Sequence, residues 1–186
     1  MDLFEYLAAA FTLVLSFAVI RLVGGLPSAL VVERRYWVHV LLLVAVLSMV
    51  ASIFWALWSF REASWNYPAF LLVLAQPGLV YFLAATIVPD SPSDVGSWKT
   101  HYYSVRVRFF VGWICLAVLT GMIPIVVLQM PLLNLGLVPA LCGLLIGVVG
   151  SVSTSAKVHA GLVVIIASLM IASIFVTLFE PGSLAH

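Results

Sequence analysis

The chain consists of long apolar segments separated by short polar ones. Runs of apolar residues are separated by short segments rich in proline, glycine and charge. A helix needs about 20 mostly apolar residues to cross the hydrocarbon core of a bilayer. The pattern therefore predicts six spans, at approximately residues 6–25, 36–60, 67–88, 109–129, 132–153 and 158–179. Residues 24–27, with the sequence GGLP, are predicted to end the first span.

The apolar runs are too long, and too uniformly apolar, for the strands of a membrane barrel, which alternate in polarity over about ten residues. Only helices and closed barrels satisfy all backbone hydrogen-bonding groups in lipid. We therefore expect an all-α integral membrane protein, in which residues 1–186 form a single transmembrane domain with a six-helix bundle.

A shorter amphipathic segment precedes the fourth span. Apolar and aromatic residues recur there at helical spacing, at Trp98, Tyr102, Val105 and Phe109. Asp94 and Ser97 are both suitable N-caps for such a helix. The pattern predicts a short helix that lies on the inner membrane surface and leads into the fourth span.

Composition agrees with a membrane location. The chain is 65% hydrophobic and 8% charged, whereas soluble domains carry about 25% charged residues. A formal net charge of +1 argues against nucleic acid as a partner, because nucleic-acid binding requires a clustered basic surface. The lipid bilayer is therefore the expected surroundings of most of the chain.

The basic residues fall on one side of the predicted topology. Seven of the eight are in or beside the odd-numbered loops: Arg21, Arg34, Arg35, Lys99, Arg106, Arg108 and Lys157. Arg61 lies in the second loop, on the opposite side. Because lysine and arginine concentrate in cytoplasmic loops, we expect the odd-numbered loops in the cytoplasm and both termini outside. A bacterial inner (plasma) membrane is the expected location.

The third span contains a polar amide and two helix breakers at its centre, Gln76, Pro77 and Gly78. Proline removes one backbone hydrogen bond, so we expect a kink or a short unwound turn. In many transporters, broken helices at mid-membrane bind substrate or ions. The same three residues also fit an ordinary kink whose amide joins two helices. On the transport interpretation, Tyr81 and Thr120 are further candidates to line the path.

The fifth span carries its smallest residues on one helix face: Gly136, Ala140, Gly143, Gly147 and Gly150. Small residues let two membrane helices approach closely. This face is predicted to pack against another helix of the same chain or, alternatively, to form a homo-oligomer.

Three histidines fall on the predicted cytoplasmic side. His39 begins the second span and His159 begins the sixth, so their rings should lie at similar depth, and His101 precedes the fourth span. Two imidazoles on two helices are suited to haem ligation, and three are suited to a divalent metal. Interfacial histidines are also common without a ligand, so no cofactor is expected from this pattern alone.

The sequence shows no recognisable motif for nucleotide binding, serine hydrolysis or zinc proteolysis, and no catalytic residues are identified. The first functional hypothesis is a small channel or carrier for an ion or small solute, with the third helix lining the path. The alternative is a non-transporting accessory or assembly subunit that binds another membrane protein. The third is a haem-binding or metal-binding membrane protein.

Overall fold

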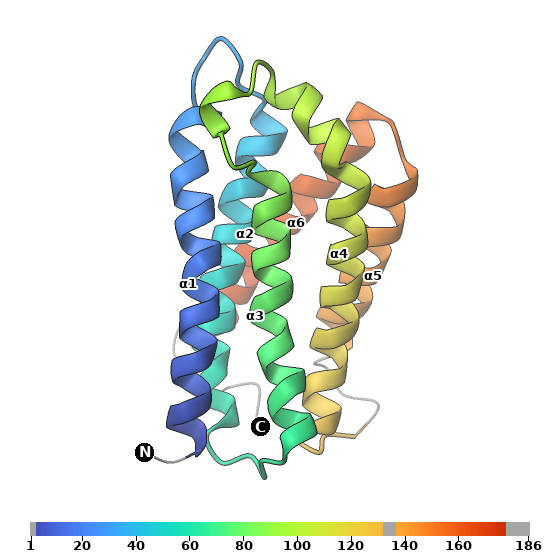
Figure 1. The fold of residues 1–186 in the computed structure, drawn as a ribbon. Coiled ribbons are helices and arrows are strands. Elements are labelled where there is room, and N and C mark those ends of the chain that lie inside the picture. The colour runs from blue at the N-terminus through green and yellow to red at the C-terminus, as the bar shows by residue number, and fades with distance from the viewer. Residues whose placement is uncertain (1–2, 132–136, 178–186) are drawn as a thin grey trace.

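The computed structural model describes residues 3–131 and 137–177, and these residues form six α-helices and no strand (Figure 1). The α-helices are α1 (Leu3–Ala29), α2 (Trp37–Ala56), α3 (Tyr67–Ile87), α4 (Trp98–Val126), α5 (Leu137–Val152) and α6 (Ala156–Thr177). Two short 3-10 helices, η1 (Leu57–Phe60) and η2 (Pro92–Asp94), lie in the connections. The predicted all-α fold class is confirmed for this part of the chain.

Five segments of the described chain are long and apolar enough to cross a membrane: Leu3–Ala29, Trp37–Phe60, Tyr67–Asp94, Trp98–Val126 and Ala156–Phe175. These long apolar helices define a multi-pass membrane protein. The fifth predicted span corresponds to α5, which is apolar but has only 16 residues. Residues 132–136, with which that span was predicted to begin, lie outside the described residues.

Successive helices run in opposite directions, so three connections meet at one end of the bundle (Figure 1). These connections join α1 to α2, α3 to α4, and α5 to α6. Within the bundle, α4 packs against both α3 and α5, α3 packs against α1, and α6 packs against α2. The end where the three connections meet carries seven of the eight basic residues, and we call it the basic end.

The prediction that residues 24–27 end the first span is wrong, because α1 continues to Ala29. Gly25 is buried, and a methyl group there would lie 2.5 Å from a methyl group of Val88. This glycine therefore allows α1 to approach the end of α3 closely. Pro27 lies in the last turn, where its missing N–H costs the helix one hydrogen bond near its end.

The short surface helix predicted before the fourth span does not form a separate element. Residues 98–108 are instead the first turns of α4. Ser97, one of the two predicted caps, accepts a hydrogen bond from the backbone N–H three residues later, at 3.4 Å. Trp98 and Tyr102 are buried and Lys99 is exposed. The amphipathic pattern therefore corresponds, on its aromatic side, to packing within the bundle.

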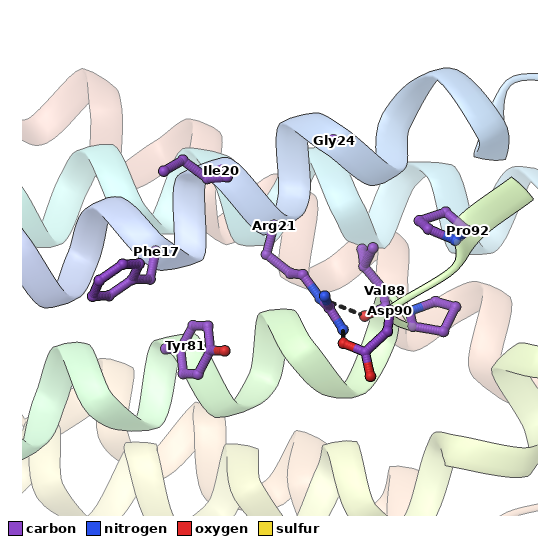
Figure 2. Close-up of a pocket in the computed structure, with 9 residues that line it drawn as sticks. Phe17, Ile20, Arg21, Gly24, Tyr81, Val88, Asp90 and Pro92 are labelled. Atoms are coloured by element: carbon purple, nitrogen blue, oxygen red, sulfur yellow. Dashed lines mark hydrogen bonds and ion pairs between the residues drawn. The ribbon is translucent and has the colours of Figure 1, made fainter.

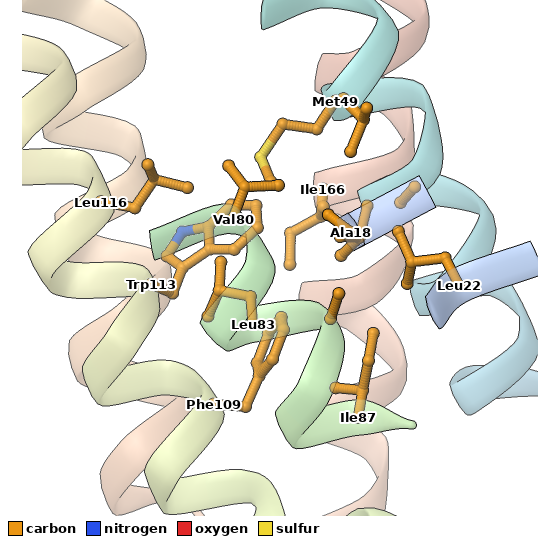
Figure 3. Packing of buried hydrophobic residues seen from close by; sticks show 14 of the residues in the cluster. Ala18, Leu22, Met49, Val80, Leu83, Ile87, Phe109, Trp113, Leu116 and Ile166 are labelled. Atoms are coloured by element: carbon orange, nitrogen blue, oxygen red, sulfur yellow. The ribbon is translucent and has the colours of Figure 1, made fainter. Parts of the chain in front are cut away.

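The centre of the bundle is filled with apolar side chains (Figure 3). They include Met49 of α2, Val80 and Leu83 of α3, Trp113 and Leu116 of α4, and Ile166 of α6. Each of them is at most 7% exposed. This apolar layer separates the middle of α3 from the polar groups at the basic end.

Candidate functional site

Gln76 faces the interior of the bundle. It belongs to the buried stripe of α3 that also contains Val73, Pro77 and Val80, and it is 9% exposed. Its amide forms no hydrogen bond with any residue in the described part of the chain. Pro77 has no backbone N–H, so it donates nothing to the carbonyl of Val73 four residues earlier. The middle of α3 thus presents an unpartnered amide beside a weakened backbone.

The unwound turn expected at Gln76, Pro77 and Gly78 is not present, because α3 is a continuous helix from Tyr67 to Ile87. A proline inside a membrane helix is tolerated when its surroundings hold the helix, and Pro77 is buried among neighbouring helices. A side chain added at Gly78 would meet nothing within 4 Å. Gly78 is therefore not needed for close helix packing.

The other two predicted path residues are not brought together with Gln76. Tyr81 is 42% exposed, and its ring packs against Phe17 of α1 with the ring centroids 6.3 Å apart. Tyr81 therefore lies on the outer surface of the bundle rather than inside it. Thr120 is half-buried on α4, and no hydrogen bond joins it to Gln76 in the described chain.

The small-residue face of α5 packs against α4 of the same chain. A methyl group at Gly143 would lie 2.9 Å from Cβ of Ala117, and one at Gly147 would collide with Ile114. Gly150 lies directly against the ring of Phe110. Ala140, also buried, faces Gly121 of α4, while Gly136 lies outside the described residues. Packing against α4 of the same chain explains the small residues on this face of α5. A homo-oligomer formed through α5 stays a prediction.

The three histidines gather at the basic end, where the beginnings of α2, α4 and α6 meet. His39 is fully buried and stacks on Trp98, with centroids 4.6 Å apart. The His101 ring meets His39 edge-on at 5.9 Å. Nε2 of His101 lies 3.1 Å from the carbonyl oxygen of Ile87 and donates to it, because a carbonyl can only accept.

His159 connects α6 to α4 through a defined tautomer. Its Nε2 lies 2.9 Å from the carbonyl oxygen of Ser153 and must donate to it. In the neutral ring Nδ1 is then an acceptor, so the Tyr102 hydroxyl donates to it at 3.0 Å. The Arg106 guanidinium also donates to the Ser153 carbonyl. Both nitrogens of His159 are therefore occupied by protein groups.

His39 differs from the other two histidines. Both of its ring nitrogens are buried and lack a hydrogen-bond partner in the described chain. A buried polar atom left without a partner costs about 1–3 kcal/mol. His39 is therefore a fully buried polar side chain at this end of the bundle whose hydrogen-bonding groups are unused within the described chain.

The arrangement of the rings limits what the histidines can ligate together. Tyr102 packs edge-on against His39 at 6.3 Å and against His159 at 5.5 Å. A haem held between His39 and His159 would have to displace this tyrosine and break its hydrogen bond. No group of three His, Cys, Asp or Glu side chains in the described residues is placed to hold a metal ion.

Two tyrosines complete the cluster. The Tyr36 and Tyr103 hydroxyl oxygens lie 3.5 Å apart. Burial, together with this contact, raises the pKa of the Tyr36 phenol, so it stays protonated. Sequence reasoning missed the roles of Trp98 and Tyr102 in enclosing His39. Their four-residue spacing predicts an apolar helix face, and in the structure this face packs inside the bundle rather than on the membrane surface.

No protein-family model matches the chain, and no curated protein or solved structure gives a significant match. The long apolar helices define the class, a helical multi-pass membrane protein.

Proposed function

We propose that this protein is a small channel or carrier for an ion or small solute, and that the structure corresponds to a closed state. The observation that supports this proposal is a pair of interior side chains without partners. Gln76 on α3 and His39 on α2 both face the interior of the bundle and form no hydrogen bond within the described chain; the His39 ring nitrogens are fully buried, whereas the Gln76 side chain is 9% exposed. In a low-dielectric interior such groups are costly unless something binds them.

The two groups lie at different depths. Ile87, whose carbonyl meets His101 beside His39, is 11 residues beyond Gln76 on α3. At about 1.5 Å per residue this separation is about 16 Å. The apolar layer that contains Val80 and Leu83 lies between them. A solute passing along the interior would first replace a hydrating water by a hydrogen bond to Gln76. It would then cross the apolar layer when the helices separate, and bind next to His39.

The proposal includes six spans and an orientation. We infer that α5 also crosses the membrane and that the basic end faces the cytoplasm. The charge distribution supports this orientation, because basic loops stay on the cytoplasmic side. The termini would then be outside, and a bacterial inner (plasma) membrane is the proposed location.

Flux measurements test the proposal. Purified protein in liposomes is assayed for K⁺ and H⁺ movement with fluorescent dyes and for glycerol and urea by stopped-flow light scattering. We expect one of these probes to cross faster than in empty liposomes. Gln76→Leu and His39→Phe should each lower that flux by at least about tenfold, which corresponds to about 1.4 kcal/mol.

Tyr81→Phe is the matched control, because Tyr81 lies on the outer surface of the bundle and the substitution keeps its ring. It should leave flux unchanged. Normal flux in Gln76→Leu would contradict the proposed path. Flux no faster than in empty liposomes for all four probes would favour the alternative class.

That alternative is the non-transporting accessory or assembly subunit. The observation that favours it is α6, whose most apolar segment is only 22% buried and exposes Ile165, Ile171 and Phe175. Such a face suits lipid or another membrane protein. Co-purification of one partner in fixed stoichiometry from mild detergent would support this alternative.

A further inference from the structure

A groove of about 330 Å³ runs along the outer surface of the bundle between α1 and α3, ending at the segment that follows α3 (Figure 2). One end is apolar and is lined by Phe17, Ile20 and Tyr81. The other end is charged and is lined by Arg21 and Asp90. The groove is thus amphipathic along its length, like a lipid molecule.

The charged end holds a partly satisfied ion pair. Nε of Arg21 donates to the carbonyl of Val88 at 2.9 Å, and Nη2 donates to a carboxylate oxygen of Asp90 at 2.6 Å. A guanidinium has five N–H donors, and Nη1 of Arg21 has no partner in the described chain. The Asp90 side chain is 98% exposed. The unused N–H groups on Nη1 of Arg21 and the exposed carboxylate of Asp90 therefore lie side by side at the charged end of the groove.

We propose that this groove binds a zwitterionic phospholipid with a primary amine, phosphatidylethanolamine. Its phosphate would accept from Arg21, its ammonium would donate to Asp90, and one acyl chain would lie along Phe17 and Tyr81. The positive Arg21 and the negative Asp90 are complementary to the negative phosphate and the positive ammonium of this headgroup, which are also adjacent. Phosphatidylcholine has no N–H to donate, and phosphatidylglycerol has no amine.

The depth of Arg21 agrees with a headgroup contact. The 27 residues of α1 span about 40 Å at about 1.5 Å per residue, about 10 Å more than the hydrocarbon core. Arg21 is eight residues from the end of α1, or about 12 Å. Its side chain, directed toward that end, reaches the boundary where lipid phosphates lie.

Native mass spectrometry of the full chain in mild detergent tests the proposal. Phosphatidylethanolamine, phosphatidylcholine and phosphatidylglycerol with identical acyl chains are titrated separately, and bound lipids are counted. We expect the first phosphatidylethanolamine to bind about two- to fivefold more tightly than either competitor, as expected for one exposed charge pair. Equal affinity for the three lipids would overturn the headgroup assignment.

Two variants localise the binding. Gly24 lines the groove, and a Cβ added there would meet nothing within 4 Å, so the longer side chain of Gly24→Leu can extend into the groove and should remove the tight lipid. Gly161→Leu on α6, where space is equally open, is the matched control and should retain it. Asp90→Asn should abolish the preference over phosphatidylcholine while the protein folds normally. Unchanged binding in both Gly24→Leu and Asp90→Asn would overturn the site.

Discussion

The hydroxyl of Tyr102 on α4 donates a hydrogen bond to Nδ1 of His159 on α6, across 3.0 Å in a buried site. The two residues are 57 positions apart in the sequence. Because α6 packs mainly against α2, this bond is a specific link between α6 and the α4 side of the bundle. The Ser153 carbonyl, which accepts from Nε2 of His159, determines that Nδ1 is the nitrogen without a proton and that Tyr102 donates to it.

Tyr102→Phe should destabilise the protein. The substitution keeps the ring but leaves Nδ1 of His159 without a partner, which costs about 1–3 kcal/mol. Thermal unfolding in detergent, followed by tryptophan fluorescence, should show a lower midpoint. Tyr103→Phe is the control, because its hydroxyl makes only a 3.5 Å contact. Equal midpoints for wild type and Tyr102→Phe would contradict the assigned bond.

Gly147→Ala should weaken the packing of α5 on α4. A methyl group there would collide with Ile114 and lie 3.2 Å from the backbone oxygen of Phe110, which cannot move away easily. Overpacking of this kind costs about 1–3 kcal/mol. Gly161→Ala meets open space and should be neutral or stabilising by about 0.5–1 kcal/mol. A stabilised Gly147→Ala variant would show that the small-residue face is not in contact.

Some of these features were predictable from the sequence, and the reasons are physical. Apolar runs long enough to cross a bilayer predicted α1 to α4 and α6. The spacing of Gly143 and Gly147 predicted a helix face that contacts another helix. Both predictions were possible because run length and residue spacing are local properties of the sequence. The partner of that face depends on which helices become neighbours in the fold. The sequence therefore could not predict that α5 packs against α4. Gly25 was misinterpreted as a helix end for the same reason, since its role depends on Val88.

The candidate site was only partly predictable. His39 and His159 were expected at similar depth, because each begins a span at the same end, and His101 was expected on the same side of the membrane. Whether their nitrogens have partners depends on side-chain directions that no sequence pattern specifies. Gln76 was identified from its chemistry alone, and the facing of Tyr81, which the structure places on the outer surface of the bundle, could not be read from the sequence. Each residue of an α-helix is rotated by about 100° from the one before it, so Gln76 and Tyr81, five positions apart, need not lie on the same face of α3.

Gln76→Leu separates a transport role from a packing role. If the amide joined two helices, its loss would destabilise the protein by about 0.5–1.5 kcal/mol. Because Gln76 has no partner in the described chain, we expect the unfolding midpoint to stay constant or rise while flux falls. A lower midpoint with unchanged flux would instead identify the amide as a packing group.

His39→Phe is the sharpest test of the polar cluster. Phenylalanine preserves the aromatic stack on Trp98 and removes two nitrogens that lack partners, so stability should stay constant or rise by up to about 1–3 kcal/mol. Addition of Zn²⁺ or of the chelator EDTA should leave the unfolding midpoint of the wild type unchanged, because His159 already uses both nitrogens within the protein. If instead Zn²⁺ raised the wild-type midpoint and had no effect on His39→Phe, a metal would be the missing partner of His39. The flux lost in His39→Phe would then reflect a displaced metal rather than a missing contact to the transported solute.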